Sequence, residues 1–233
     1  MQYEIHTRKG YIMQQVINFA VPPSKIKKIK VAAAIAGSLG KPSKMPGLSY
    51  GISALACRVG SKLAKVAGSV CSGCYALKAN YSYPSVMKAH HKRYSALTSI
   101  SWADSMVTLI GNSKTDYFRW HDSGDLQSFQ HLLDIVSIAE RLPNVNFWLP
   151  TREKQFVNMF TRSFGDFPSN LVVRVSAAMV DSEAPTGYAN TSTVHSDKLI
   201  DGVECKAYLN HNKCGDCRLC WNKEVKNVSY RQH

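Results

Sequence analysis

Residues 116–176, DYFRWHDSGDLQSFQHLLDIVSIAERLPNVNFWLPTREKQFVNMFTRSFGDFPSNLVVRVS, alternate short runs of β-branched and aromatic residues with longer amphipathic runs. Strands are predicted at 116–121, 145–149 and 171–176, and helices at 128–142 and 153–164. Strands that alternate with single helices form right-handed βαβ units in a parallel sheet. The stretch therefore predicts an α/β fold, either a partial (β/α) barrel or an open parallel sheet.

Further elements are expected on both sides of this stretch. Strands are predicted at 11–21 and 49–57 and helices at 84–97 and 102–111, with Ser101 and Ser128 as N-caps of the helices that follow them. Residues 38–47 predict a loop, and the polar residues 177–203 predict no regular element. One domain is expected over residues 1–233, with an α/β core at about 45–176. A cysteine-rich C-terminal extension, residues 177–233, is expected to fold back on this core.

The composition is that of a folded protein, because 45% of the 233 residues are apolar and suffice to build a core. The best apolar run, residues 31–36, is far too short to span a membrane. Residues 1–10 lack the apolar segment of a secretory signal. We therefore expect a cytoplasmic protein without a membrane partner.

Seven cysteines are unusual in a cytoplasmic protein, where disulfides are disfavoured, and an odd number cannot pair completely. Residues 71–74 form a C-x2-C motif and residues 214–220 a C-x2-C-x2-C motif, spacings that let thiolates of one turn bind metal. The candidate ligands are Cys57, Cys71 and Cys74, the three-cysteine group, and Cys205, Cys214, Cys217 and Cys220, the four-cysteine group.

This division predicts iron–sulfur chemistry. Four thiolates complete a 4Fe–4S cluster, while three thiolates leave one iron open to a ligand. Two other arrangements stay open, in which ligands of both groups share one cluster or hold one larger cluster. Zinc is the alternative metal, but zinc sites more often use two separate C-x2-C pairs, which would leave three of these cysteines unused.

A second set of candidate site residues lies where the predicted strands end, which is where parallel α/β folds form sites. The set, expected to bind a cofactor, is Arg119, His121, Ser123, Gly124, Asp125 and Arg152. Gly124 permits close backbone approach, and Asp125 would accept a hydrogen bond from an amine or a ribose. Arg152 would reach a carboxylate or phosphate, and His121 would be a ligand or proton carrier. Alternatively, Asp125 caps the next helix and Arg152 forms a surface ion pair.

Simpler roles are expected for other residues. Trp120 and Trp148 are predicted to pack in the core, and Trp221 to cover the tail. His90 and His91 are expected to be solvated. The chain contains no Walker loop, G-x-G-x-x-G or G-x-S-x-G motif, which excludes the commonest nucleotide-binding and hydrolase sites.

The net charge of +13 attracts anions, although only residues 24–30 form a dense basic run. A solvated basic surface and weak nucleic-acid binding explain this charge equally well. In the second case, binding would use Lys25 to Lys30 and the C-terminal tail, which is expected to be basic.

Five segments together resemble the bacteriophage "gene product eighty-eight" family. They are residues 38–47, 49–51, 71–76, 119–125 and 214–221. The resemblance covers most of the chain from about Ser38 onward. It implies a phage protein made in bacterial cytoplasm, where a host or phage factor would be its partner.

A more distant resemblance is to radical S-adenosylmethionine enzymes. The three-cysteine group and Ser123-Gly-Asp125 occupy places similar to the cluster-binding loop and the methionine-binding motif of that family. The resemblance implies an open iron and bound S-adenosylmethionine. Three functions follow as hypotheses: a radical-type redox enzyme, an electron-transfer or redox-sensing protein, and a metal-stabilised nucleic-acid-binding module.

Overall fold

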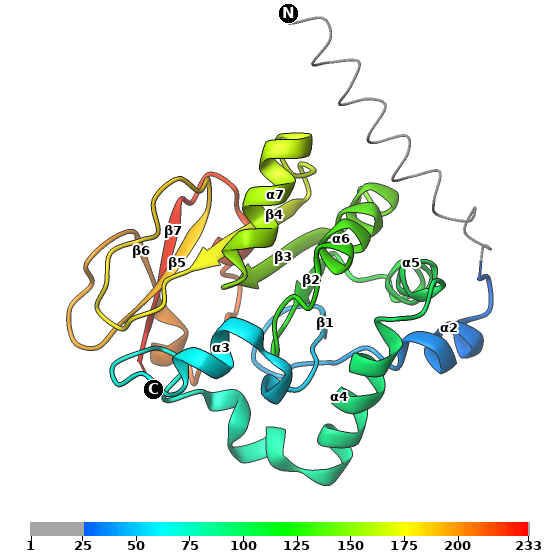
Figure 1. Ribbon diagram of the computed structural model, residues 1–233, viewed down its shortest axis with the longest axis horizontal. Coiled ribbons are helices and arrows are strands. Elements are labelled where there is room, and N and C mark those ends of the chain that lie inside the picture. The colour runs from blue at the N-terminus through cyan, green and yellow to red at the C-terminus, as the bar shows by residue number, and fades with distance from the viewer. Residues whose placement is uncertain (1–25, 233) are drawn as a thin grey trace, which may run out of the picture.

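The fold is described by a computed structural model over residues 26–232, so the strand predicted at 11–21 lies outside it (Figure 1). The helices are α2 (Ile29–Ala36), α3 (Arg58–Leu63), α4 (Pro84–Ala96), α5 (Trp102–Asn112), α6 (Phe129–Arg141) and α7 (Lys154–Phe164). The strands are β1 (Leu48–Tyr50), β2 (Tyr117–Trp120), β3 (Asn146–Thr151), β4 (Leu171–Ser176), β5 (Thr191–His195), β6 (Val203–Cys205) and β7 (Asn227–Arg231). Short 3-10 helices are η1 (Ala54–Ala56), η2 (Tyr75–Leu77), η3 (Ala79–Ser82), η4 (Lys206–Leu209) and η5 (Leu219–Trp221).

All seven strands form one open sheet in the order β1-β2-β3-β4-β5-β7-β6. Every pairing between these strands is parallel. The predicted open parallel sheet is confirmed, and the partial barrel is wrong, because β1 and β6 remain at opposite edges. Parallel strands bring their carboxyl ends to one side, so the loops after β1, β2, β3 and β4 meet there.

One face of the sheet packs against helices. Alternate side chains of the strands, such as Phe118 and Phe147, point to this face and meet the apolar stripes of α5, α6 and α7 (Figure 1). In α6 the stripe includes Leu132, Ile135 and Ala139, at helical spacing. Ser128 begins this helix as predicted, because its side chain accepts a hydrogen bond from the His131 N–H at 3.1 Å.

The opposite face of the sheet is covered by the cysteine-rich segment. Trp148 of β3 and Val228 of β7 point to this face and pack with Cys220 and Trp221. The indole N–H of Trp221 donates to the Phe118 carbonyl at 3.0 Å and ties the segment to β2. Trp120 and Trp148 are buried, as predicted, and Trp221 covers the segment that carries the four-cysteine group.

The residues that follow Ala177 differ from the expectation of an irregular segment. They contribute β5, β6 and β7 to the same sheet. The strand β5 was missed because its side chains are polar and buried, so it lacks an apolar pattern. Side-chain hydrogen bonds hold β5 to β7 in place of apolar contacts. Asn227 of β7 donates to Thr193 Oγ1 at 3.0 Å and accepts from Thr191 Oγ1 at 3.1 Å.

Three local predictions also need correction. The strand predicted at 49–57 ends at Tyr50, since the Ile52 N–H bonds to the Ser123 carbonyl instead of continuing a ladder. His90 is buried rather than solvated, because its ring stacks on Tyr81 at 6.0 Å between centroids. Ser101 precedes α5 without a capping hydrogen bond from its side chain.

Across residues 26–232, no helix has both the length and the apolar character needed to cross a bilayer.

Candidate functional site

The three-cysteine group lies beyond the carboxyl end of β1. Cys57 is the N-cap of α3, and Cys71 and Cys74 share a turn in which the Cys74 N–H donates to the Cys71 carbonyl at 3.2 Å. A Cβ atom added to Gly60 would lie 3.6 Å from the Sγ atoms of both Cys57 and Cys71, so these thiols face the same space. Cys74 is close enough that its charge raises the pKa of both other thiols.

The environment of this group keeps the thiols of Cys57 and Cys71 protonated in the absence of a cation. Burial raises the pKa of Cys57 to about 12, and Asp125 and the two other thiols add to the rise. Burial also raises the pKa of Cys71, while the positive charge of Arg152 opposes this. Thiolates form at such positions when a metal displaces the proton.

The ends of β3 and β4 hold the cysteine loop in place. Glu153, which is fully buried directly after β3, accepts a hydrogen bond from the Val59 N–H at 3.0 Å. This bond fixes the start of α3, two residues after Cys57. The Val70 N–H donates to the Ala178 carbonyl at 2.9 Å, so the approach to Cys71 is fixed by the loop after β4.

Replacing Glu153 by Ala is expected to loosen the three-cysteine group. The Val59 N–H would lose its partner in a largely buried place, which lowers the free energy of unfolding by about 1–3 kcal/mol. Urea unfolding followed by tryptophan fluorescence measures this loss. Glu153→Gln keeps an acceptor oxygen and should retain most of the stability, and Glu140→Ala, on the exposed side of α6, is the matched control. A Glu153→Ala protein as stable as the control would contradict the assignment.

Asp125 serves the fold rather than presenting a free carboxylate. Its oxygens accept hydrogen bonds from Thr151 Oγ1 at 2.6 Å and from the N–H groups of Arg152 and Leu126, each at 2.8 Å. Burial nevertheless raises its pKa to about 6, since these bonds only partly compensate for lost solvation. Asp125 therefore joins the end of β2 to the end of β3, and Ser128 rather than Asp125 caps α6.

The rest of the segment after β2 is also packed inside the protein. Gly124 has φ +82°, and a Cβ there would lie 2.3 Å from Ile52 Cγ1, so only glycine fits. Ser123 is buried, and His121 is buried with both ring nitrogens lacking a hydrogen-bond partner. Burial lowers the pKa of His121 well below its ordinary value, and the adjacent His131 and Arg119 reinforce this. The segment closes the core beside the three-cysteine group.

Arg152, a member of the predicted cofactor set, is half-exposed at the edge of the three-cysteine group. Its Nε donates to the Ala177 carbonyl at 3.3 Å, which holds the guanidinium beside the loop after β4. Its charge lowers the pKa of Cys57 and Cys71 against the effect of burial. Arg152 is thus placed to receive an anionic group next to these thiols.

The four-cysteine group lies on the face of the sheet opposite α5 and α6. Cys205 ends β6 and pairs in register with Tyr230 of β7, whose hydroxyl lies 3.1 Å from Cys220 Sγ. Burial raises the pKa of Cys214, and Cys205 and Cys217 raise it further. Burial likewise raises the pKa of Cys220 to about 12, again with a contribution from Cys205. Charges on neighbouring thiols of this group therefore add to the effect of burial.

A buried arginine organises the segment that carries the four-cysteine group. Arg174, in the middle of β4, is fully buried. Its guanidinium donates to six backbone carbonyls, those of Thr191, Leu219, Cys220, Asn222, Val225 and Lys226, at 2.8–3.3 Å. The loop around η5 thus folds around this one side chain.

Arg119 lies between the two cysteine groups. Its guanidinium stacks over Trp148 at 4.5 Å and donates to the Tyr75 hydroxyl at 3.2 Å, and Tyr75 directly follows Cys74. On its other side, its positive charge lowers the pKa of Cys214 and Cys220. Burial disfavours the charged form of Arg119, but its interactions with Tyr75, Asp122 and Tyr230 favour that form and raise its pKa overall. Arg119 therefore acts as a fixed cation at the junction of the two groups.

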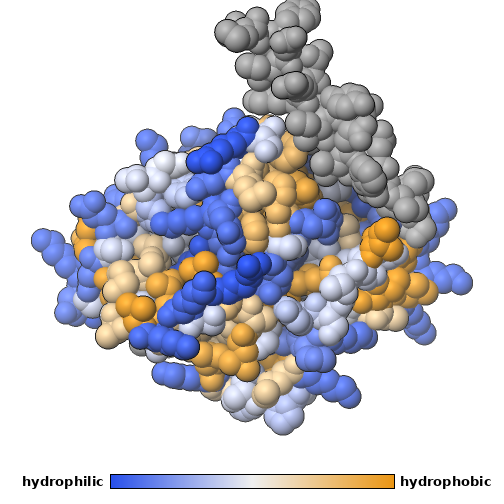
Figure 2. Space-filling view, viewed as in Figure 1, coloured by the Kyte–Doolittle hydropathy of each residue, from blue (hydrophilic) through white to orange (hydrophobic). Residues whose placement is uncertain are grey.

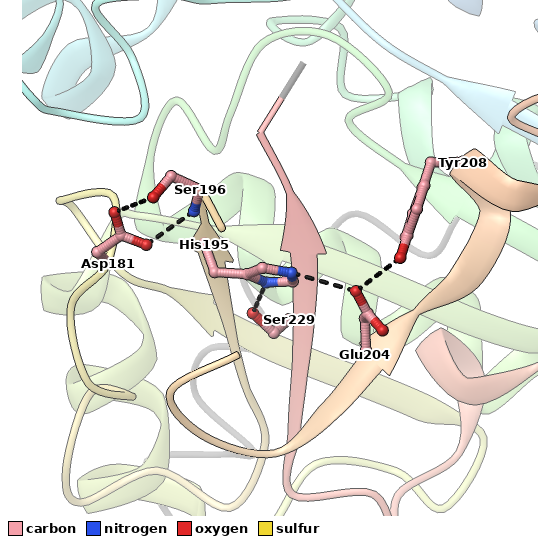
Figure 3. Close-up of polar contacts among 6 residues, drawn as sticks. All are labelled: Asp181, His195, Ser196, Glu204, Tyr208 and Ser229. Carbon is pink, nitrogen blue, oxygen red and sulfur yellow. Dashed lines mark hydrogen bonds and ion pairs between the residues drawn. The ribbon is translucent and has the colours of Figure 1, made fainter. Parts of the chain in front are cut away.

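A polar network supports the strand that carries Cys205. His195 of β5 lies 2.7 Å from Ser229 Oγ and 3.3 Å from Glu204 Oε1, and Tyr208 donates to the same Glu204 oxygen at 3.1 Å (Figure 3). The network links β5, β7 and the edge strand β6. Glu204 directly precedes Cys205, so these bonds hold the position of that thiol.

The seven thiols are all free cysteines, and no disulfide joins them. Within residues 26–232, no three Cys, His, Asp or Glu side chains converge closely enough to hold a single metal ion. Ligands of one zinc ion at about 2.3 Å must lie within about 4 Å of one another. Neither cysteine group has that arrangement.

Four contributors to the site carry no sequence motif and were not predicted. Glu153 and Arg174 act through hydrogen bonds to Val59 and Cys220, which lie 94 and 46 positions away in the chain. Glu204 and Tyr230 act through contacts with His195 and Cys220, which lie 9 and 10 positions away. Only Arg174 had a local signal, because a charged residue within the apolar run LVVRVS requires buried partners.

The chain was compared with known proteins. No curated protein and no solved structure matches it. None of the comparisons supports the resemblance to radical S-adenosylmethionine enzymes. The profile of the family described as Gene product 88 matches residues 24–223, which is most of the chain. The chain therefore belongs to the Gene product 88 family.

Proposed function

We propose that this protein is an iron–sulfur redox protein with two separate cluster sites. The four-cysteine group would hold a cluster with a thiolate for each iron of a cube, and the three-cysteine group a cluster with one iron free of protein ligands. The proposal is supported by the seven free thiols, which the sequence divides into groups of three and four, and by Arg119, which donates to the hydroxyl of Tyr75 beside Cys74.

Bound clusters supply one-electron transfer, and an iron without a protein ligand binds a small molecule. The residues of this chain have other tasks. Trp221 and Tyr230 shield the four-cysteine group from water, because both pack against Cys220. Arg119 places a positive charge near both groups, which favours the reduced, more negative state of a cluster. Arg152 offers a guanidinium to an anionic ligand beside the three-cysteine group.

S-adenosylmethionine is the ligand that the family resemblance suggested for the open iron, and Arg152 would receive its carboxylate. Ser123, Gly124 and Asp125 are poor candidates for binding its amine, since the first two are packed inside the protein and Asp125 already accepts three hydrogen bonds. Electron transfer between the two sites is therefore the first function to test, and cofactor cleavage the second.

The test measures iron, zinc and acid-labile sulfide per chain in protein purified without oxygen. Iron and sulfide are expected in equal amounts, and a variant with Cys57, Cys71 and Cys74 changed to Ala should lose about half of both. A variant with Cys214 and Cys217 changed to Ala should lose the other half. Zinc without sulfide would refute the proposal, and loss of all iron in either variant would favour one shared cluster.

Electron paramagnetic resonance of the reduced protein then distinguishes the two functions. A spectrum of the three-cysteine site that changes when S-adenosylmethionine is added, with formation of 5′-deoxyadenosine, would establish the radical-type enzyme. A reversible spectrum that the cofactor leaves unchanged would establish electron transfer alone. Arg152→Ala should weaken any change that the cofactor causes, while Arg162→Ala on α7 serves as the control.

A further inference from the structure

Positive charge is unevenly distributed along this chain. Residues 5–103 contain 15 Lys and Arg residues and no Asp or Glu. Residues 104–233 contain 14 Lys and Arg and 15 Asp and Glu. The net charge of +13 therefore comes entirely from the residues before Asp104. Residues 177–233 contain seven residues of each sign, so the expectation of a basic C-terminal tail is wrong.

The described portion of this acid-free part, residues 26–103, forms a chain of contacting elements in the fold. Elements η1, η2, η3 and α4 pack one against the next, with α3 beside η1 and α2 beside α4 (Figure 1). Residues 26–103 contain 12 Lys and Arg, and all except Arg93 are exposed. Arg93 is buried because it donates to the Ser38 carbonyl at 2.8 Å and the Gly51 carbonyl at 3.2 Å. We call the part of the surface that carries Arg58, Lys62, Lys65, Lys78, Lys88 and Lys92 the basic face.

Exposed aromatic rings lie among these cations. Tyr75, Tyr83 and Tyr94 are 51%, 56% and 44% exposed. On α4, Lys88 and Lys92 lie four residues apart and so occupy one side of the helix. Tyr94, two residues after Lys92, is exposed on a different side of the same helix. Hydrophilic and hydrophobic side chains accordingly alternate over the lower part of the molecule in Figure 2, where Figure 1 places α3 and α4.

We propose that the basic face binds single-stranded nucleic acid. Lysines and arginines that follow a backbone attract its phosphates, and exposed aromatic rings stack on unpaired bases without regard to sequence. A duplex would meet the cations but could not use the rings, because its bases are already stacked. Acidic peptides and anionic membranes offer no unpaired bases on which the three tyrosine rings could stack.

This inference goes beyond the proposed redox function and does not depend on bound metal. It also has a consequence for the three-cysteine group, because Arg58 directly follows Cys57 and Tyr75 directly follows Cys74. A strand bound along the basic face would pass this group. Nucleic acid is therefore the substrate class that could reach an open iron there.

The test is fluorescence anisotropy of the full chain with labelled single strands of about 20 nucleotides, at salt concentrations from about 50 to 200 mM. Single-stranded DNA and RNA are expected to bind, with affinity that falls steeply as salt rises. The double variant Lys88→Glu/Lys92→Glu should weaken binding about tenfold or more. Lys154→Glu/Lys226→Glu changes the net charge equally at exposed positions outside the basic face and should have a much smaller effect.

Tyr94→Ala tests the stacking contribution and should weaken single-strand binding several-fold while leaving the salt dependence unchanged. Equal weakening by both lysine pairs would overturn the proposal, because diffuse net charge would then explain binding. Duplexes or anionic phospholipid vesicles that bind as tightly as single strands would overturn it in favour of those partners. The three-cysteine variant separates this inference from the redox function, since it should lose iron yet still bind the strand.

Discussion

Changing Arg174 to Met is expected to release the segment that carries the four-cysteine group from the sheet. Arg174 is fully buried and donates to six backbone carbonyls, most of them within residues 219–226. Methionine fills a similar volume but donates nothing, so these carbonyls would be left without partners in a dry interior. The expected loss in free energy of unfolding is about 3–5 kcal/mol, the range found when one partner of a buried charged network is removed.

Urea unfolding measures this loss, and limited proteolysis locates it. Cleavage is expected between residues 206 and 226 under conditions in which the wild-type protein resists. Arg174→Lys retains the charge but has only three donors, so it should recover a minor part of the stability. Arg162→Met, on the exposed side of α7, is the matched control and should change stability by no more than about 0.5 kcal/mol. A change below about 1 kcal/mol for Arg174→Met would show that the segment does not depend on this residue.

The same variant links the fold to the proposed function. If the four-cysteine group depends on Arg174, anaerobically purified Arg174→Met protein should lose the iron and sulfide of that site. The three-cysteine group is held by Glu153 and the loop after β4 instead, so its share should remain. Equal loss from both sites would contradict their independence.

Acid is expected to destabilise the protein through two buried histidines. Burial lowers the pKa of His131 to about 3, against an ordinary value of 6.5, and lowers that of His121 in the same direction. Between pH 6.5 and 3 the unfolded chain therefore binds a proton at His131 that the folded chain does not. Stability falls as pH falls through this window, by about 2 kcal/mol at pH 5 for His131 alone.

The comparison of wild type with His131→Leu isolates this term. Between pH 7 and pH 5 the wild type should lose about 2 kcal/mol more than the variant, as measured by urea unfolding at each pH. Asp125 acts with the opposite sign, because its raised pKa of about 6 favours the folded state as pH falls, but this term is common to both proteins. His91→Leu, at an exposed position of α4, should keep the wild-type dependence. Identical pH profiles for wild type and His131→Leu would refute the assignment.

The sequence identified which residues are candidate ligands, but it predicted less well which residues surround them. The C-x2-C and C-x2-C-x2-C spacings identified the cysteines, because ligands within one turn leave a local trace. The HDSGD segment was expected to bind a cofactor, yet Asp125 bonds to Thr151 and Arg152 and Gly124 packs on Ile52. A polar turn that follows a strand has the same local sequence whether it binds a ligand or joins two strand ends.

The sequence by itself determined the central βαβαβ unit, since apolar periodicity differs between strands and helices and is a property of neighbouring residues. It also determined the concentration of positive charge before Asp104, and its cysteine spacings predicted metal binding by the thiols. Only the tertiary structure decided that the sheet stays open, that β5 and β7 join it through polar side chains, and that Arg119 donates to the hydroxyl of Tyr75 beside Cys74. These features depend on contacts between residues far apart in the chain, such as those of Glu153 with Val59 and Arg174 with Cys220, and such contacts leave no periodic pattern in a single sequence.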